Sequence, residues 1–239
     1  ALAIQRFYRL RQMDPLSAVN IDAGAITSLK NSEDVFETEH IAGGRRLGDA
    51  NLRYRQTGTN WLSARTVTMT GIASVTYSTN AAGTEYKASY RINNGLSGNL
   101  IFESAFIFHR DFFEWEVGVS NLTGGNVELG DLALPLPMNT AFSSPSSSVF
   151  KHSFVSGHGS FIFWMRPNSV GPYLLMTPTG DTWLEYWDRL NGGYEVYIHS
   201  KAEGAVAAAQ GTQWRQPNTS LLLGPGESQR YGFKFQWAD

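Results

Sequence analysis

Apolar and polar residues alternate along most of this chain with a period of two. The pattern is clearest from residue 112 to 120, where Phe113, Trp115, Val117 and Val119 fall on one side and polar or small residues fall on the other. Side chains of a β-strand point alternately to opposite faces, so this segment predicts a strand with one buried face. Residues 100–109 supply a second such strand, and the charged residues 109–111 between them predict a hairpin turn.

Similar segments follow one another at intervals of roughly ten residues, separated by Gly, Asn, Pro and Thr. The last of them carries Tyr231, Phe233, Phe235 and Trp237 on one face. This aromatic face must be covered, either by the opposite sheet or by a further domain. Many short strands with this punctuation are typical of a β-sandwich. Besides the hairpin, the predicted strands are 4–11, 18–29, 52–55, 66–77, 87–92, 127–136, 154–165, 173–176, 183–186, 194–199 and 230–237.

Three features interrupt the strand pattern. Within residues 65–77 the alternation slips by one position at Gly71, which predicts a single strand with a β-bulge at that glycine. Only residues 202–210 have a helical composition, and Gly204 weakens even that segment. The serine-rich residues 143–148 predict a flexible loop. We therefore expect an all-β protein with few or no helices, in which residues 1–239 form one domain of two large stacked antiparallel sheets.

Composition and charge narrow the classes of function. The chain has 19 basic and 21 acidic residues and no cysteine. This balance provides no positive field for nucleic acid or an anionic membrane, and the missing cysteines exclude disulfide scaffolds, zinc modules and thiol enzymes. No apolar run approaches the ~20 residues of a membrane span. The sequence starts at Ala1 without a Met or a leader, as a processed product would, so secretion is allowed. We expect no cofactor and no metal.

Motifs of nucleotide-binding proteins, serine hydrolases and zinc proteases are absent from the chain. The catalytic candidates are Glu114, Glu116 and His158. The two glutamates share one face of a predicted strand at roughly 7 Å, a separation compatible with the carboxylate pair of a glycosidase. Carboxylates on a solvated strand face have the same pattern, and His158 is equally typical of a turn histidine. For Glu114, Glu116 and His158, both a catalytic role and an ordinary surface or turn position therefore stay open.

Aromatic residues carry the stronger functional signal. The chain contains 7 Trp, 10 Tyr and 14 Phe. Strand alternation places Trp183, Glu185 and Trp187 on one face, with Tyr194 close by in sequence, and saccharide sites combine such flat rings with carboxylates. Arg166 follows another tryptophan and is a candidate clamp for a carboxylate or uronate. The alternative is that these aromatic residues pack against protein.

Several segments together resemble a known family. They are Asp22-Ala-Gly-Ala-Ile-Thr-Ser-Leu29, Arg46-Leu-Gly-Asp-Ala-Asn-Leu-Arg-Tyr-Arg55, Asn126-Val-Glu-Leu-Gly-Asp-Leu-Ala-Leu-Pro135, His152-Ser-Phe-Val-Ser-Gly-His-Gly-Ser160, Trp183-Leu-Glu-Tyr186 and Leu223-Gly-Pro-Gly-Glu-Ser-Gln-Arg-Tyr-Gly-Phe233. The chain resembles the N-terminal galactose-mutarotase-like β-sandwich of large carbohydrate-active proteins. In glycoside hydrolases and polysaccharide lyases of this build, a helical toroid follows the sandwich.

The resemblance implies a secreted or extracellular module of a longer protein that binds or frames a polysaccharide or oligosaccharide. The implied binding residues are Trp183, Glu185, Trp187, Tyr194, His158 and Arg166. In such proteins the catalytic acid mostly comes from the toroid, and the His-Pro motif of true mutarotases is missing here. Two alternatives stay open. The chain is a stand-alone glycan-active enzyme that uses its carboxylates or His158, or it is a structural domain that docks onto a neighbour.

Overall fold

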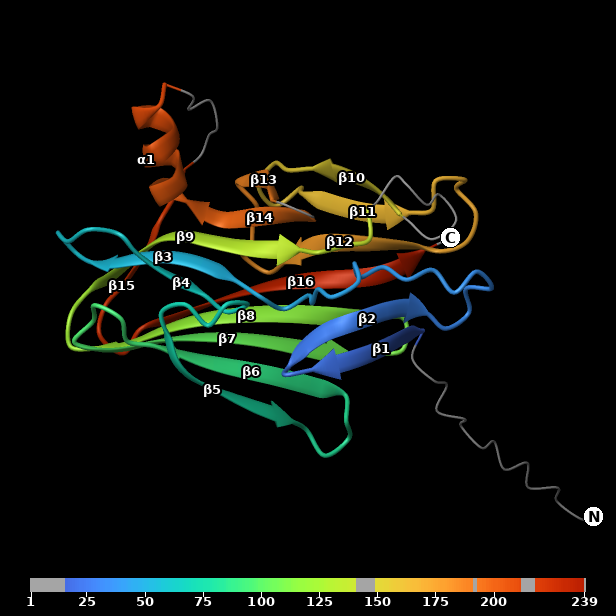
Figure 1. Cartoon of the computed structure of the whole chain (residues 1–239), viewed down its shortest axis with the longest axis horizontal. Coiled ribbons are helices and arrows are strands. Elements are labelled where there is room, and N and C mark those ends of the chain that lie inside the picture. Colours follow the sequence, from blue (N-terminus) through green and yellow to red (C-terminus); the bar gives the residue numbers. More distant parts are fainter. Residues whose placement is uncertain (1–15, 141–148, 191–192, 212–217, 239) are drawn as a thin grey trace, which may run out of the picture.

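The computed structural model describes residues 16–140, 149–190, 193–211 and 218–238. The described chain forms antiparallel strands and one short helix, α1 (Lys201–Ala209) (Figure 1). The strands are β1 (Ser17–Asp22), β2 (Ala25–Asn31), β3 (Asn51–Gln56), β4 (Leu62–Arg65), β5 (Ile72–Thr79), β6 (Glu85–Ile92), β7 (Gly98–Phe108), β8 (Phe112–Thr123), β9 (Val127–Leu136), β10 (Phe150–Phe154), β11 (Phe161–Met165), β12 (Tyr173–Thr179), β13 (Tyr186–Leu190), β14 (Gly193–Ser200), β15 (Leu221–Leu223) and β16 (Ser228–Ala238).

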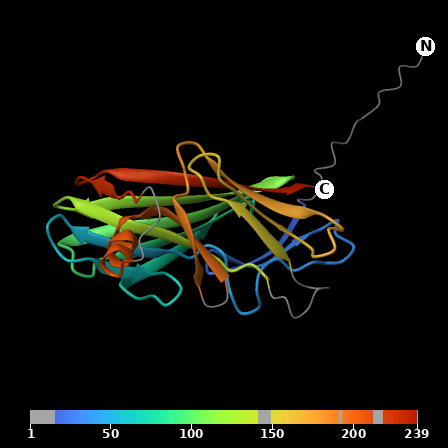
Figure 2. The same ribbon diagram turned by 90° about the horizontal axis from the view of Figure 1, so that it is seen from above.

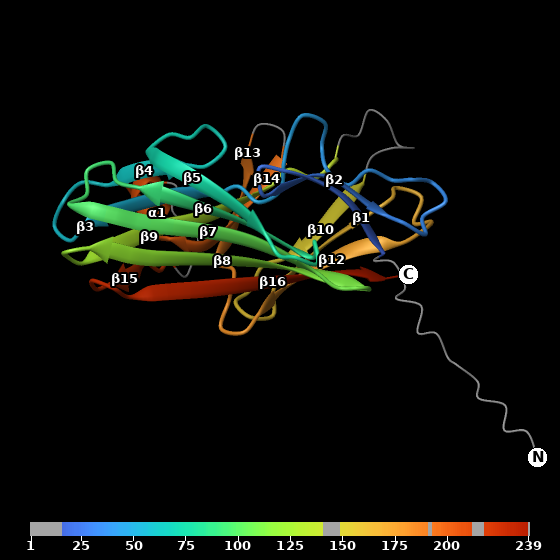
Figure 3. The ribbon, with the colours of Figure 1, turned by 90° about the horizontal axis from the view of Figure 1, so that it is seen from below.

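The strands form two layers. One layer is an eight-stranded sheet in the order β10-β11-β12-β16-β8-β7-β6-β5, and Figure 3 shows its long strands side by side. The other layer contains the six-stranded sheet, ordered β13-β14-β9-β3-β4 with β15 paired to β9, and the β1–β2 hairpin. Viewed from above, α1 lies at the opposite end of the molecule from β1 and β2 (Figure 2). The expected all-β sandwich with few helices is confirmed.

Aromatic side chains fill the space between the layers. Phe113, Trp115, Phe233 and Phe235 are fully buried, as their alternation predicts. The rings of Phe113 and Phe235 stack with centroids 4.6 Å apart. The buried indole of Trp115 donates a hydrogen bond to the Ser104 hydroxyl at 2.9 Å, so its polar atom is satisfied. The strand alternation in the sequence thus identified the central core.

Four predicted strands are wrong in their limits: residues 18–29, 66–77 and 154–165, and residues 183–186, of which only Tyr186 belongs to a strand, β13. Residues 18–29 form two strands, because Ala23 and Gly24 take positive φ angles of 49° and 71° and turn the chain. Residues 66–77 are not one bulged strand: Met69 and Gly71 have φ angles of 56° and 71°, and the turn they form carries the chain from one sheet to the other. A β-bulge and a tight turn leave the same slip in the alternation.

Residues 154–165 are not one strand either: Phe154 is the last residue of β10, a turn follows, and Phe161–Met165 form β11. In that turn, the Ser160 hydroxyl donates a hydrogen bond to the Gly157 carbonyl at 2.7 Å. The weak helix at 202–210 exists, shifted by one residue, as α1. The predicted strand 4–11 and the loop 143–148 lie outside the described residues.

Replacement of Gly130 by Ala is expected to destabilise the protein by about 1–3 kcal/mol. A Cβ atom at Gly130 would lie 2.5 Å from the Trp61 ring and 3.0 Å from Ala202, so the indole that covers β9 must shift. Urea unfolding measures the effect. Gly125→Ala is the matched control, because a Cβ atom there meets nothing within 4 Å. Equal midpoints for the two variants would contradict the prediction.

Candidate functional site

A cleft of about 810 Å³ lies between the outer face of the six-stranded sheet and the segments that join it to the β1–β2 hairpin. Its walls are polar and carry both signs of charge. The lining side chains used below are Arg46, Asp49, Asn51, Arg53, Arg65, Asp131, Glu195 and Tyr197. A concave site with a few convergent polar groups is the usual form of a small-molecule or cofactor site. This cleft is therefore the candidate functional site.

Strand alternation aims these side chains into the cleft. In β3, Leu52 and Tyr54 are buried in the core, so Asn51 and Arg53 point to the other face. The registers of β3, β9 and β14 then place Asn51, Ala133 and Tyr197 in one row across the sheet. Arg65 of β4 extends this row, because it pairs with Asn51. The cleft floor is thus made by four neighbouring strands.

Glu195 is a buried acceptor of the cleft floor, with 5% of its surface exposed. Tyr197 donates its hydroxyl to Oε1 of Glu195 at 2.6 Å, and the Asn51 amide donates to Oε2 at 2.8 Å. Burial and the neighbouring Glu195 raise the pKa of the Tyr197 hydroxyl, so the phenol stays protonated and remains a donor. The two neutral donors fix the orientation of the carboxylate.

Asp131 occupies the end of the cleft next to α1. Its Oδ1 accepts hydrogen bonds from the backbone N–H groups of Ala202 and Glu203, at 2.9 and 3.0 Å, in the first turn of the helix. Its Oδ2 lies 3.2 Å from Nε of Arg53. Burial nevertheless raises the pKa of Asp131 to about 6, because desolvation outweighs these contacts. Asp131 therefore holds α1 against the sheet and changes charge near neutral pH.

The arginines of the cleft differ in how they are held. Arg46 is fixed by two hydrogen bonds of 2.9 Å to the Asp49 carboxylate, and Thr66 donates to the same carboxylate at 2.7 Å. Arg53 is bound by Asp131 and Glu203. The exposed guanidinium of Arg65 has no side-chain partner within the part of the chain that the structure describes. Arg65 is therefore available to a ligand.

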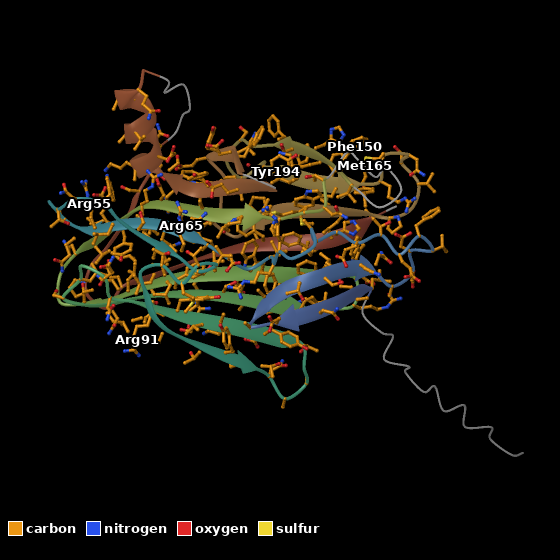
Figure 4. The ribbon with its side chains drawn as sticks, viewed as in Figure 1. Arg55, Arg65, Arg91, Phe150, Met165 and Tyr194 are labelled. Atoms are coloured by element: carbon orange, nitrogen blue, oxygen red, sulfur yellow. The ribbon has the colours of Figure 1, made fainter. Side chains whose placement is uncertain are left out.

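The aromatic residues singled out in the sequence separate into two pairs outside this cleft. Trp183 is 39% exposed and contacts His158, with ring centroids 5.4 Å apart. Trp187 is 40% exposed and meets Tyr194 edge to face at 5.8 Å. The ammonium of Lys151 lies 3.9 and 3.6 Å from these two ring centroids. Desolvation lowers the pKa of Lys151 to about 8. Tyr194 of this aromatic pair and Arg65 of the cleft both belong to the six-stranded sheet, and Figure 4 labels them.

Glu185 does not share a face with Trp183 and Trp187, which corrects the alternation predicted there. Residues 183–185 lie outside β13, and only Leu184 forms an isolated bridge, with Gly157. Glu185 is buried. It accepts hydrogen bonds from the Ser200 hydroxyl at 2.7 Å and from the backbone N–H and hydroxyl of Thr219. The segment crosses from one sheet to the other, so its side chains do not alternate as in a strand.

The remaining sequence candidates lie in other places. Arg166 is buried, stacks on Phe36 at 3.8 Å and donates a hydrogen bond to Thr38. Glu114 and Glu116 share the outer face of β8, as predicted, and lie near His109 and Arg230 at 3.3 and 3.7 Å. None of these residues lines the cleft.

The sequence reasoning missed the cleft residues, although two of the segments that carry the family resemblance contain them. Residues 51–55 alternate polar and apolar residues, which is the signal of a strand with a functional or solvated outer face. Asp131 interrupts the apolar run of β9. Glu195 and Tyr197 precede α1 with no motif around them. What joins them is strand pairing between residues far apart in sequence.

The structure contains no helix, within its described residues, that is long and apolar enough to cross a membrane. Nor do the described side chains include a group of three or more His, Asp or Glu residues placed to hold a metal ion.

Residues 29–239 match the sequence profile of a family of unknown function (DUF5695). No curated protein matches the sequence. Among solved structures, the chain is similar to a polysaccharide lyase with a TM-score of 0.68 and 14% identity, over 95% of this chain and 33% of the lyase. It therefore spans about a third of the lyase's length.

Two smaller proteins match over nearly their whole length. One is a putative aldose 1-epimerase from Escherichia coli K12, with a TM-score of 0.55 and 10% identity over 95% of this chain and 97% of the epimerase. The other is a galactose mutarotase-like protein from Lactobacillus casei ATCC 334, with a TM-score of 0.51 and 9% identity over 93% of this chain and 96% of that protein. The chain thus has the galactose-mutarotase-like β-sandwich fold that the sequence motifs implied.

Proposed function

The chain belongs to the DUF5695 family, and we propose that its function is to bind a carbohydrate chain in the cleft of the six-stranded sheet. The observation that carries the proposal is the set of fixed hydrogen-bonding groups on the cleft floor. Glu195 and Asn51 are oriented by each other and by Tyr197, and Arg65 extends from the same row without a partner. Sugar hydroxyls both donate and accept, so a site with oriented carboxylate, amide and guanidinium groups complements them.

The proposed binding surface continues beyond the cleft onto two aromatic pairs. His158 with Trp183, and Trp187 with Tyr194, present partly exposed rings on which the apolar faces of sugars can stack. In this proposal they contact additional units of the glycan. Glu185 and Arg166 contribute indirectly, since both are buried and hydrogen-bonded to protein.

Replacement of Arg65 by Ala is expected to weaken glycan binding about tenfold, because a hydrogen bond to a charged group is worth about 1.5–3 kcal/mol. Affinity electrophoresis against a panel of neutral and acidic polysaccharides measures the change. Arg91→Ala is the control, because Arg91 is exposed on β6 in the other layer (Figure 4). Trp183→Ala tests the aromatic pairs in the same assay. Absence of binding to every polysaccharide, or equal loss in Arg65→Ala and Arg91→Ala, would refute the cleft as a glycan site.

A catalytic role is the second candidate, and the Glu195–Tyr197 pair favours it over the pair on β8. Glu195 is enclosed in the cleft, where Tyr197 and Asn51 orient its carboxylate, whereas Glu114 and Glu116 lie on an open sheet face. Release of reducing ends from the same panel, lost in Glu195→Gln and retained in Glu114→Gln, would support it. Binding of a polysaccharide without release of reducing ends would instead support a domain that only binds the glycan.

The proposal also includes a larger protein around this domain. Its similarity to only a third of a polysaccharide lyase supports a module that frames a glycan for a helical toroid in the same extracellular protein. A structural docking domain is the competing outcome. It would be favoured if the polysaccharide panel gives no binding while a neighbouring domain protects the Trp183 and Trp187 side chains from solvent.

A further inference from the structure

Strand β5 forms one edge of the eight-stranded sheet and pairs with β6 alone. In Figure 1 it is the outermost strand of that layer, with no other element beyond it. Six of its eight residues are exposed, from Ala73 and Ser74 to Thr76, Tyr77, Ser78 and Thr79. An edge strand presents a row of unpaired backbone N–H and C=O groups, which is a template for pairing with another strand.

β5 lacks two of the usual protections against such pairing, charge and proline, and the irregularity in its pairing with β6 is confined to its first residues, between Ile72 and Ser74. Its sequence, residues 72–79, contains no charged residue and no proline. The other edge strands of the described chain are either charged or very short: β1, β2, β4, β10 and β13 contain Asp22, Lys30, Arg65, Lys151 and Asp188, and β15 has three residues. Native proteins protect edges with charges, proline or short strands. β5 is therefore the one long, uncharged edge among the described strands.

Exposed apolar side chains accompany this edge. Met69, in the turn before β5, is 41% exposed, and Tyr77 within β5 is 49% exposed. The backbone of Met69 has a positive φ angle of 56°, which L-residues rarely adopt. A partner strand along β5 would cover apolar surface as well as backbone groups.

We propose that β5 is a dimerisation edge at which two copies of this chain pair antiparallel about a two-fold axis. Around the two-fold axis of such a pair, a residue of one chain lies opposite the same residue of the second chain or one close to it in sequence. A charged residue there would therefore face a like charge. The absence of charge in β5 removes that repulsion, which favours a second copy over a charged peptide as the occupant. The dimer joins two eight-stranded sheets into one continuous sheet, while the strands of the cleft floor belong to the other layer.

Sedimentation velocity of the 239-residue chain, over a range of protein concentrations, tests the proposal. The expected mass rises toward twice the 26.5 kDa of one chain, and Thr76→Lys is expected to return it to that of the monomer. Thr57→Lys is the matched control, because Thr57 is exposed in a turn after β3, away from β5. Circular dichroism verifies that the variants are folded. If Thr76→Lys does not fold, Ser78→Lys is the second edge variant.

Cysteine scanning gives an independent readout, because residues 1–239 contain no cysteine. Single cysteines at residues 74–78 are oxidised and separated on a denaturing gel. Residues opposite each other across an antiparallel pair have Cβ atoms about 4.5–5.5 Å apart, so at least one position is expected to cross-link two chains while Thr57→Cys is not. A wild-type protein that stays monomeric at every concentration, or a dimer unaffected by the edge lysines, overturns the proposal.

Discussion

Replacement of Glu185 by Ala is expected to lower the free energy of unfolding by about 3 kcal/mol. The carboxylate accepts hydrogen bonds from Ser200 and from both the backbone N–H and the hydroxyl of Thr219 in a buried position. The alanine variant leaves these donors without a partner and removes packing volume. Thermal and urea unfolding measure the change.

The conservative variant separates a structural role of Glu185 from a ligand-binding role. Glu185→Gln keeps the side-chain volume and one acceptor, so we expect a smaller loss of stability and unchanged glycan affinity. Thr219 also contacts Nδ1 of His199 at 2.7 Å, and Nε2 of His199 lies 2.6 Å from the Tyr231 hydroxyl, so the network reaches β16. An alanine variant with unchanged stability and lost glycan binding would instead assign Glu185 to the ligand.

Acidification from pH 7 to 5 is expected to destabilise the protein by about 3 kcal/mol. Burial lowers the pKa of both His40 and His199 to about 4. Between pH 6.5 and 4 the unfolded chain therefore binds protons that the folded chain does not, so stability falls as the pH falls, by about 2 kcal/mol for each histidine at pH 5. Asp131 opposes this by about 1 kcal/mol, because its pKa is raised to about 6 and protonation favours the folded state.

Urea unfolding at several pH values tests this origin of the pH dependence. The slope of stability against pH is expected to flatten in His40→Gln and in His199→Gln, whatever each substitution does to stability at pH 7. His152→Gln is the control, because His152 is exposed on β10. A slope that is the same in all three variants as in the wild type would show that other groups cause the acid sensitivity.

The main features of the fold were predictable because they depend on local alternation. The hairpin of β7 and β8 and the aromatic face of β16 follow from a period of two that continues over many residues. The limits of the strands were harder to predict at residues 23–24, 66–71 and 155–160. There a turn and a bulge produce the same slip in the pattern, and only the backbone angles distinguish them.

The sequence by itself determined the fold class, the core aromatic residues and the family. The first two follow from alternation within single strands, and the family follows from contiguous segments of sequence. The tertiary structure decided the candidate site. Asn51, Asp131, Glu195 and Tyr197 come from three strands, and Asn51 and Glu195, which share a hydrogen bond, are 144 residues apart; the side chains converge only through the registers of β3, β9 and β14. Register between distant strands is set by packing and turn geometry, which no local pattern specifies. Glu185, two residues after the exposed Trp183, is buried because its segment crosses between the sheets and does not alternate as a strand would.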